Sequence, residues 1–327
     1  MERLLRDKRV LVTGGAGFIG SNLVESLLYS GNFVVCLDNF STGKRENLTS
    51  FVDNQNFRLI EGDIRNYDDC LKAVENIDVV FHEAALGSVP RSIKDPVTTT
   101  DVNIGGFVKM LFASKEAGVK RFVYAASSST YGDHPDLPKV EEKIGSPLSP
   151  YAITKYVDEL YADIFFKTYG IEVIGLRYFN VFGRRQTPDG AYAAVIPKFV
   201  KSLIKHEVPL INGDGSVSRD FTYVDNVIQV NHLAAIVGNK EALNQVYNVA
   251  HGERTSLNQL FYSIREKAGK YDNDILTIEP EYGPVRSGDI PHSLASIDKA
   301  KRLLGYSPVL SVEEGLTEAL KWYWENL

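Results

Sequence analysis

The chain has 327 residues, of which 44% are hydrophobic and 24% are charged, and its formal net charge at neutral pH is −6. This length accommodates about two domains, and the composition is that of a folded globular protein, which excludes collagen-like and disordered chains. A mildly acidic chain gives no reason to expect non-specific nucleic-acid binding, which requires a basic surface.

The first predicted elements alternate between short apolar runs and helical patterns. Strands are predicted at residues 9–13, 33–38, 56–61, 79–82, 122–125 and 173–177, and helices at residues 19–30, 108–117 and 154–167. Strands that stay apolar at every position are typical of a sheet covered by helices on both faces. The alternation therefore predicts an α/β fold, a Rossmann-type doubly wound parallel sheet.

After residue 178 the pattern changes. Glycine and proline punctuate longer segments, which predicts loops at 183–190, 212–220 and 279–293, and residues 246–250 form one more strand pattern. We expect a first domain over residues 1–178 with a return segment near 223–250. Residues 179–222 and 251–327 are expected to form a smaller α/β domain.

The cellular compartment is constrained by apolar runs and cysteines. No apolar run approaches the ~18 residues of a membrane span, and glycines directly after residues 10–12 leave no apolar region of a signal peptide. Cys36 and Cys70 form no disulfide framework, and the histidines show no metal-binding spacing. We therefore expect a cytoplasmic protein with no metal and with neither a membrane nor a nucleic acid as partner.

Gly14, Gly17 and Gly20 lie between the first predicted strand and the first predicted helix. Such glycines permit a tight turn and a close approach of the backbone to a pyrophosphate, and the helix N-terminus adds amide donors. The second predicted strand ends in Asp38, eighteen residues after Gly20. A carboxylate there binds both hydroxyls of an adenosine ribose and repels a 2′-phosphate, so the pattern favours NAD over NADP.

Tyr151 and Lys155 are four residues apart, so a helix places them on one face, one turn apart. The positive charge of Lys155 favours the ionised form of the tyrosine, which can then act as a base. Ser127, at the end of the fifth predicted strand, supplies a hydroxyl that bridges the tyrosine and a substrate hydroxyl. Such a Tyr–Lys pair is expected by chance in any chain of this size, and its position 24 residues after Ser127 carries the signal.

These motifs, together with residues 38–43, 177–183 and 219–221, resemble the extended short-chain dehydrogenase/reductases of the NAD-dependent epimerase/dehydratase family. Residues 84–92, 127–131 and 190–197 are most similar to the bacterial UDP-N-acetylglucosamine 4-epimerases of that family. The resemblance implies an isomerase that interconverts UDP-N-acetylglucosamine and UDP-N-acetylgalactosamine for surface-polysaccharide precursors. The first domain is then the NAD-binding domain and the second the UDP-sugar-binding domain.

The resemblance also implies a mechanism. Tyr151, with Ser127 and Lys155 as the other catalytic residues, would take the proton from the sugar O4 as C4 passes a hydride to tightly bound NAD. The resulting 4-keto sugar then rotates about its diphosphate, and the hydride returns to the other face. Ser128 and Ser129 stand where related dehydratases carry an Asp-Glu pair, which favours epimerisation without elimination of water.

The same resemblance assigns the binding residues. The cofactor is assigned to Gly14, Gly17, Phe18, Ile19, Gly20, Asp38, Asn39, Phe40, Ser41, Thr42, Gly43, Asp63, Ile64, Ala84, Ala85, Asn103, Tyr151, Lys155 and Tyr178. The UDP-sugar is assigned to Gly87, Ser88, Ser127, Ser128, Ser129, Asn180, Ala194, Val195, Arg219, Arg286, Asp289 and Ser293. Within this set Arg219 and Arg286 are expected at the diphosphate. In the family, the residue at the position of Ser293 limits substrate size. A serine there leaves room for an N-acetyl group.

Several alternatives stay open from the sequence. The enzyme is alternatively a 4-epimerase of a UDP-hexuronic acid, such as UDP-N-acetylglucosaminuronic acid, or of UDP-glucose. Arg184 and Arg185 either meet a C6 carboxylate or form a solvated basic loop. A reductase that exchanges NAD(H) and a non-catalytic NAD sensor are more remote alternatives.

A homodimer is expected from two helical segments, residues 104–117 and 154–168. Their apolar residues include Phe107, Met110, Leu111, Leu160, Ile164 and Phe165. Relatives pair two such helices from each subunit. The alternative is that these faces pack only on the sheet of their own chain.

Overall fold

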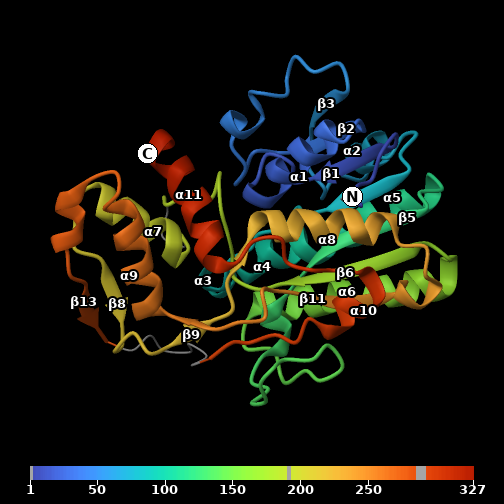
Figure 1. Ribbon diagram of the computed structural model, residues 1–327. Coiled ribbons are helices and arrows are strands. Elements are labelled where there is room, and N and C mark those ends of the chain that lie inside the picture. The colour runs from blue at the N-terminus through green and yellow to red at the C-terminus, as the bar shows by residue number, and fades with distance from the viewer. Residues whose placement is uncertain (1–2, 190–192, 285–291) are drawn as a thin grey trace.

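A parallel seven-stranded sheet forms the centre of the protein in a computed structural model, which describes residues 3–189, 193–284 and 292–327 (Figure 1). The spatial order of its strands is β11-β6-β5-β4-β1-β2-β3. Their bounds are β1 (Arg9–Thr13), β2 (Phe33–Asp38), β3 (Phe57–Glu61), β4 (Val79–His82), β5 (Arg121–Ser127), β6 (Glu172–Tyr178) and β11 (Gln245–Val249). All neighbouring strands run parallel, which confirms the predicted Rossmann-type α/β fold.

Helices cover both faces of this sheet. The longer ones near it are α1 (Phe18–Tyr29), α2 (Tyr67–Ala73), α5 (Phe107–Glu116), α6 (Pro150–Tyr169) and α8 (Val224–Ile236). Successive residues of β1 alternate between two clusters: Val10 and Val12 pack with α1 and α8, and Leu11 packs with α2, α5 and α6. Because both sides of β1, β2, β4, β5 and β6 are covered, these strands carry no polar alternation, as expected from the sequence. The edge strand β3 differs, since Arg58 and Glu61 are exposed.

Helix α6 begins earlier than its apolar pattern predicts. Pro150 occupies the first turn, and the Ser149 hydroxyl accepts a hydrogen bond from the Ala152 backbone N–H at 3.1 Å. Both features are typical of a helix start, because proline needs no hydrogen bond there and the serine satisfies a free amide. Tyr151 therefore lies in the first turn of α6, on the same helix as Lys155.

The predicted dimer helices are largely buried in their own chain. Phe107, Met110 and Leu111 are fully buried under the sheet and Phe165 is 7% exposed, so the expectation that they face a second subunit is wrong. Protein interiors are closely packed, and only large side chains fill the layer between α5, α6 and the sheet. These apolar residues are therefore used for packing within their own chain. Leu160 and Ile164 remain half exposed.

A second, smaller lobe lies beyond the sheet, at the left of Figure 1. Its helices are α7 (Val195–Ile204), α9 (Leu257–Ala268) and α11 (Val312–Asn326). It also holds the strand pairs β8 (Leu210–Asn212) with β13 (Glu281–Gly283) and β9 (Ser218–Arg219) with β12 (Thr255–Ser256). The loops predicted at 212–220 and 279–293 thus contain strands, which are too short to show any periodicity in sequence.

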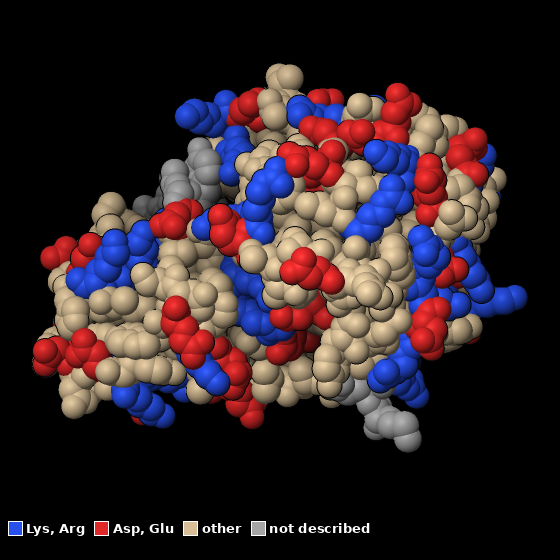
Figure 2. All heavy atoms as spheres, turned by 90° about the horizontal axis from the view of Figure 1, so that it is seen from above, with Lys and Arg blue, Asp and Glu red and all other residues tan. Residues whose placement is uncertain are grey.

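The remaining short elements connect these parts. They are α3 (Val89–Lys94), α4 (Pro96–Thr100), α10 (Asp298–Leu304), the parallel pair β7 (Val181–Phe182) with β10 (Thr222–Tyr223), the π-helical turn Asp101–Gly106, and the 3-10 turns Arg45–Leu48, Ser128–Tyr131, Lys240–Ala242 and Asn273–Thr277. Among the described residues, every helix is too short or too polar to cross a bilayer. Figure 2 shows acidic and basic side chains interspersed over the face seen from above.

Candidate active site

The glycine loop after β1 is closed by contacts that leave no room for side chains. Gly14 has a φ of +68°, and a Cβ there would lie 2.8 Å from the Ala84 backbone. A Cβ on Gly20 would lie 2.2 Å from the Gly14 carbonyl oxygen. Gly17 precedes α1, and no side chain caps this helix. The amides of its first turn are therefore available to an anionic group such as a pyrophosphate.

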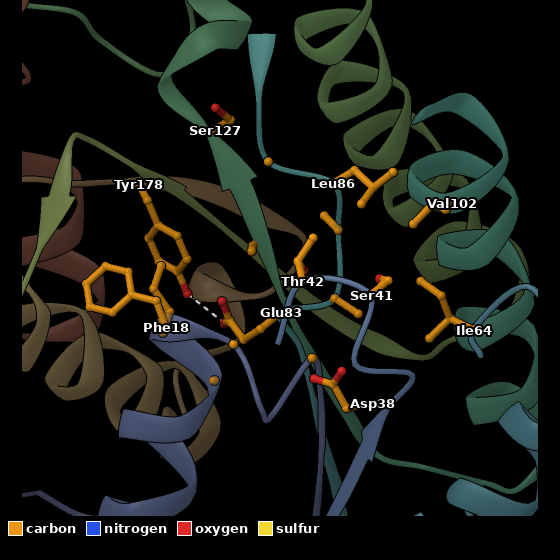
Figure 3. A pocket seen from close by; sticks show the side chains of 18 of the residues that line it. Phe18, Asp38, Ser41, Thr42, Ile64, Glu83, Leu86, Val102, Ser127 and Tyr178 are labelled. Carbon is orange, nitrogen blue, oxygen red and sulfur yellow. Dashed lines mark hydrogen bonds between the residues drawn. The ribbon is translucent and has the colours of Figure 1, made fainter. Parts of the chain in front are cut away.

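An elongated cavity of about 470 Å³ lies over this loop, at the carboxyl ends of the parallel strands. It is lined by most residues assigned to the cofactor: Gly14, Gly17, Phe18, Ile19, Gly20, Asp38, Asn39, Ser41, Thr42, Asp63, Ile64, Ala84, Ala85, Tyr151, Lys155 and Tyr178. Asp38 and Ser127 lie at opposite ends of the cavity (Figure 3). Ligands bind at this edge in open α/β sheets, so the cavity is the candidate active site.

The end of the cavity at β2 and β3 is acidic. The Asp38 carboxylate accepts hydrogen bonds from the backbone N–H groups of Ala16 and Phe40, at 2.9 and 2.8 Å, and burial raises its pKa. The Asp63 carboxylate pairs with Arg65 at 2.7 Å, which lowers the pKa of Asp63 to about 2. Each carboxylate oxygen can accept a second bond, so Asp38 keeps acceptor sites for ribose hydroxyls.

Three residues assigned to the cofactor lie outside the lining. Phe40 adopts a φ of +57° and stacks on the Arg45 guanidinium. Gly43 is packed so closely that a Cβ would lie 2.8 Å from that of Ala16. Buried Asn103 accepts a hydrogen bond from the Leu86 backbone N–H at 2.8 Å and donates one to the Thr154 hydroxyl at 3.0 Å. These residues support the wall from behind.

Ser127, Tyr151 and Lys155 line the opposite end of the cavity. The Ser127 hydroxyl oxygen accepts hydrogen bonds from the backbone N–H and the hydroxyl of Ser129, at 3.1 and 2.9 Å. Ser128 also lines the cavity, whereas Ser129 acts on Ser127 from behind. Because both bonds are accepted, the Ser127 hydroxyl proton is left to donate to another group.

Lys155 is buried and charged. Its Nζ donates hydrogen bonds to the Ala125 carbonyl at 3.0 Å and to the Asp158 carboxylate at 3.1 Å. Burial alone would lower the pKa of Lys155, but Asp158, Tyr151 and Glu83 together outweigh it, so that the pKa is raised. An ammonium group therefore lies beside Tyr151 at this end of the cavity.

Glu83 is a cavity residue that the sequence analysis missed. The Tyr178 hydroxyl donates a hydrogen bond to Glu83 at 2.8 Å (Figure 3), and the Asn231 amide donates one to the Tyr178 oxygen at 2.9 Å. Burial raises the pKa of Glu83 to about 7. Its position directly after the fourth strand run and before Ala84 was the available signal, since carboxyl ends of parallel strands carry sites.

A second cavity of about 260 Å³ adjoins the first. It is lined by Asn180, Ala194, Val195 and Arg219 of the assigned substrate residues, along with apolar side chains of the smaller lobe. Gln186, which the sequence analysis also missed, lines both cavities. Its Nε2 donates to the Val181 carbonyl at 3.0 Å, and its buried Oε1 has no hydrogen-bond partner within the described part of the chain.

The other assigned substrate residues are spread around these cavities. Gly87 lines the first cavity, and both Gly87 and Ser88 line a third cavity beside it. Ser293 is half buried, and its backbone N–H donates a hydrogen bond to the Ser218 carbonyl at 3.1 Å, directly next to Arg219. Arg286 and Asp289 lie outside the described residues. No group of metal-ligating side chains is found in residues 3–189, 193–284 and 292–327.

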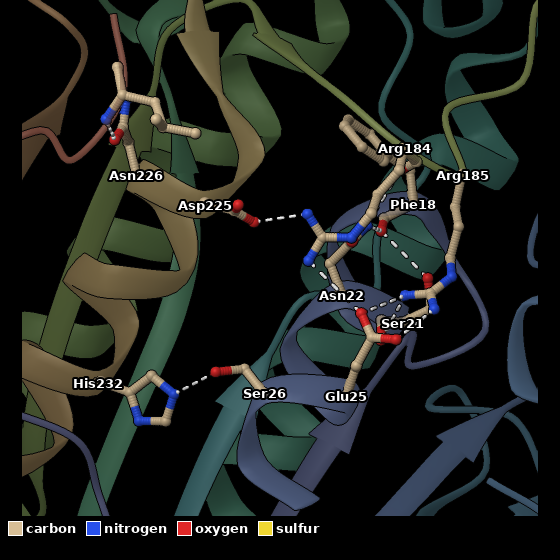
Figure 4. Close-up of polar contacts among 11 residues, drawn as sticks. Phe18, Ser21, Asn22, Glu25, Ser26, Arg184, Arg185, Asp225, Asn226 and His232 are labelled. Atoms are coloured by element: carbon tan, nitrogen blue, oxygen red, sulfur yellow. Dashed lines mark hydrogen bonds and ion pairs between the residues drawn. The ribbon is translucent and has the colours of Figure 1, made fainter. Parts of the chain in front are cut away.

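Arg184 and Arg185 are engaged by carboxylates of their own chain (Figure 4). Arg184 pairs with Asp225 at 2.7 Å and with Glu25 at 3.4 Å. Arg185 forms two hydrogen bonds to Glu25, at 2.7 and 3.1 Å. The two side chains are only 26% and 14% exposed, so the solvated basic loop is wrong, and both arginines instead tie the loop after β7 to α1 and α8.

Comparisons with known proteins agree with this geometry. Residues 10–250 match the model of the NAD dependent epimerase/dehydratase family. A UDP-glucose 4-epimerase of Mycolicibacterium smegmatis is 36% identical, over 96% of this chain and 98% of its own.

Two solved structures are also similar over nearly the whole chain. A UDP-N-acetylglucosamine 4-epimerase from Methanobrevibacter ruminantium, in complex with UDP-N-acetylmuramic acid, is 39% identical, covers 99% of this chain and 100% of its own, and has a TM-score of 0.92. A UDP-glucose 4-epimerase of Thermotoga maritima with UDP-glucose is 38% identical, covers 97% and 99%, and has a TM-score of 0.89.

Proposed function

The chain belongs to the NAD dependent epimerase/dehydratase family and is an NAD-dependent UDP-sugar 4-epimerase, and from that premise we propose that its substrates are UDP-N-acetylglucosamine and UDP-N-acetylgalactosamine. The observation that carries the proposal is the pair of adjoining cavities. One holds the NAD residues with Ser127, Tyr151 and Lys155, and the other holds Arg219. A UDP-sugar spanning both would bring its hexose to the catalytic residues while its uridine stays in the smaller lobe.

The first cavity suits NAD. We assign the pyrophosphate to the amides of the first turn of α1, where Gly17 leaves the approach open, and the adenosine ribose to Asp38. NAD supplies a nicotinamide that accepts and returns a hydride. The residues around it hold the cofactor in place, and we propose that it stays bound between turnovers.

Proton transfer falls to residues of this chain. Tyr151, beside the Lys155 ammonium, accepts the proton of the sugar O4 and later returns it. Ser127 keeps its hydroxyl proton and donates a hydrogen bond to the same oxygen, because its own oxygen already accepts two bonds from Ser129. The 4-keto sugar then rotates and presents its other face while its diphosphate stays bound. The configuration at C4 is thereby inverted.

The diphosphate and uridine belong to the second cavity in this proposal. Arg219 supplies a guanidinium that matches phosphate oxygens in pairs. Asn180, Ala194 and Val195 line the same space, next to apolar residues that suit a uracil ring. Arg286 and Asp289 stay proposals from the sequence, at the diphosphate and the uridine ribose respectively.

Two observations support an N-acetylated hexose. Ser293 is small and lies next to Arg219 through its bond to Ser218, and the similar enzyme of Methanobrevibacter ruminantium carries a UDP-sugar with an N-acetyl group. The alternative of a uronic acid loses support, because Arg184 and Arg185 are held by Glu25 and Asp225. UDP-glucose stays the second candidate, since relatives bear that name.

The test is a substrate panel followed by proton NMR. Purified protein without added cofactor receives UDP-N-acetylglucosamine, UDP-glucose or UDP-N-acetylglucosaminuronic acid, each in a separate reaction. We expect UDP-N-acetylgalactosamine to form without net NADH, and Tyr151→Phe to reduce kcat at least about 100-fold with its NAD content unchanged, because a positioned base contributes roughly that much. Faster turnover of either other substrate contradicts the substrate proposal, and near-normal turnover by Tyr151→Phe contradicts the base.

The proposal also covers domain division, cellular location and oligomeric state. We propose the division into an NAD-binding domain, residues 1–178 with the segment near 223–250, and a UDP-sugar-binding domain, residues 179–222 and 251–327, which the two cavities support. A cytoplasmic location is supported by two buried, unbridged cysteines, Cys36 and Cys70. A homodimer is supported by exposed apolar side chains on α3, α4 and α6.

A further inference from the structure

Asp158 is a buried carboxyl group on the catalytic helix that the reaction described above does not use. Its side chain has no exposed surface, and its Oδ2 lies 3.1 Å from Nζ of Lys155, one turn earlier on α6. Its Oδ1 is buried without a hydrogen-bond partner among the described residues. A buried carboxylate with one unpaired oxygen disfavours folding, so stability alone does not explain why an acid occupies this position.

The hydrogen bonds of Lys155 explain what this acid can do. An ammonium group has three protons. One is donated to the Ala125 carbonyl on β5 and one to Asp158, at 3.0 and 3.1 Å. The third proton is left for the cavity that Lys155 lines with Tyr151. Asp158 and Ala125 thus set the direction of the remaining N–H bond.

The groups that face Lys155 come from three elements. Asp158 and Tyr151 face it from α6, Glu83 faces it from the end of β4, and β5 offers only the Ala125 carbonyl. Burial would lower the pKa of Lys155, and Asp158 is the largest of the contributions that oppose this. Without that carboxylate, a lysine buried in this way tends to lose its proton, since buried lysines are known to titrate well below their usual range.

Tyr124, on β5, lies near Asp158 and stays neutral, because burial raises its pKa. Two more titratable groups lie near the pair of Lys155 and Asp158. His82, on β4, is kept neutral, because burial and then the charge of Lys155 lower its pKa to about 3. Glu159 follows Asp158 in the helix, but its carboxylate forms two hydrogen bonds with Arg177, at 2.8 and 2.7 Å. Neither residue can therefore replace Asp158 as the counter-charge of Lys155.

We propose that Asp158 is a positioning residue, which keeps Lys155 protonated and directs its free N–H bond into the cavity. The inference rests on the proposed function, because it assumes that the Lys155 ammonium serves Tyr151 and the bound cofactor. Burial raises the pKa of Asp158 itself to about 7, and Lys155 opposes that rise. Above neutral pH the acid is therefore a carboxylate, which is the range in which a buried lysine needs a counter-charge.

The test is Asp158→Asn, which keeps the shape and one acceptor oxygen but removes the charge. The variant is expected to lose activity along an alkaline limb that lies at least about one pH unit below that of the wild type, since an opposite charge at this distance shifts a titration by one to three units. The second readout is NAD content after gel filtration at pH 7 and pH 9.5. We expect the variant to release NAD only at the higher pH.

Asp163→Asn is the matched control, because Asp163 lies on the same helix but is 40% exposed and pairs with Lys167. It is expected to follow the wild type in both readouts. Should Asp158→Asn fail to fold, Asp158→Ser removes the same charge and leaves room for a water molecule. Coincident pH profiles and coincident NAD retention in wild type and variant overturn the proposal. The substrate panel and Tyr151→Phe test the proposed function separately, because neither alters Asp158.

Discussion

Asp38 shows how one residue serves both the fold and the ligand. Its carboxylate accepts the backbone N–H groups of Ala16 and Phe40, and so joins the glycine loop to the end of β2. The spacing between Gly20 and Asp38 revealed the residue from sequence, because both belong to one β-α-β unit. The two backbone bonds could not be predicted in the same way, since they depend on the positive φ of Phe40 and on the packing of Gly43 against Ala16.

Of the residues that meet across distant elements, the sequence pointed to Tyr178 but not to Glu83, Asn231 or Gln186. Glu83 follows β4, Tyr178 ends β6 and Asn231 lies in α8, yet their side chains form one chain of hydrogen bonds. Gln186 joins two cavities from the loop after β7. No local periodicity marks such residues, because their neighbours are set by the order of strands in the sheet.

The size of residue 293 decides the substrate range in our proposal, and it can be changed singly. Ser293→Tyr adds a ring beside β9, which we expect to exclude an N-acetyl group but to leave room for a hydroxyl. We predict that kcat/KM for UDP-N-acetylglucosamine falls at least about 10-fold, whereas kcat/KM for UDP-glucose changes less than about 3-fold. The exclusion of one substituent from a pocket typically changes kcat/KM by roughly 10-fold or more.

Proton NMR of both epimerisations measures this ratio. Ser296→Tyr is the control, because it adds the same ring three residues away, where the Ser296 hydroxyl bonds only the exposed Asp298. Equal losses with both substrates in Ser293→Tyr would falsify the size argument.

At the scale of elements, α6 works with two of its faces. Its inner face presents Tyr151 and Lys155 to the cavity, and its outer face exposes Ile153, Leu160 and Ile164, each at least half exposed. The neighbouring α3 and α4 add Ile93 and Val97, which are 63% and 78% exposed. Isolated apolar side chains are normal on a surface, but a continuous set on three neighbouring helices is typical of a subunit interface.

We predict that Leu160→Glu combined with Ile164→Glu converts the proposed dimer into a monomer. Both side chains are already half exposed, so the charges disrupt a subunit contact rather than the fold. Light scattering after gel filtration, at micromolar protein concentration, measures the mass. Val208→Glu, at an exposed apolar residue outside α3, α4 and α6, is the control and keeps the wild-type mass. A monomeric wild type, or a dimer that survives both charges, contradicts the homodimer.

Apolar patterns predicted the strands better than they predicted the surroundings of α5. Strands with continuous apolar runs were found within two residues of their predicted bounds, since a doubly covered sheet leaves little choice of position. The pattern of α5 could not distinguish burial under its own sheet from burial by a partner, because both surroundings select Phe107, Met110 and Leu111. Only the packing of the whole layer separates the two.

At the scale of the whole molecule, buried carboxyl groups connect stability to pH. Burial raises the pKa of Glu83, Asp158 and Asp220 to about 7. Asp220 accepts backbone N–H groups of His251, Gly252 and Ala295, and so ties β9 to distant segments. A raised pKa means that the folded chain holds a proton more tightly than the unfolded chain. The resulting stability is complete below the unfolded pKa of about 4 and is lost as the pH rises through about 7.

Buried histidines act in the opposite direction, but over a lower range. Burial lowers the pKa of His82 to about 3 and that of His232 to about 4. The unfolded chain then binds the extra protons, so these residues favour folding as the pH rises from about 4 to 6.5. Above pH 6.5 their contribution is nearly constant, which leaves the carboxyl groups to set the slope between pH 6.5 and 8.

We therefore predict that the protein, saturated with NAD, is more stable at pH 6.5 than at pH 8. Three carboxyl groups that titrate near 7 account for a loss of roughly 2 kcal/mol over this interval. Glu83→Gln keeps an acceptor for the Tyr178 hydroxyl but cannot ionise, so it should remove about a third of the loss. Urea unfolding at the two pH values measures the difference in both proteins. If the wild type is equally stable at both, or if Glu83→Gln leaves the slope as it was, Glu83 does not hold a proton in the folded chain near neutral pH.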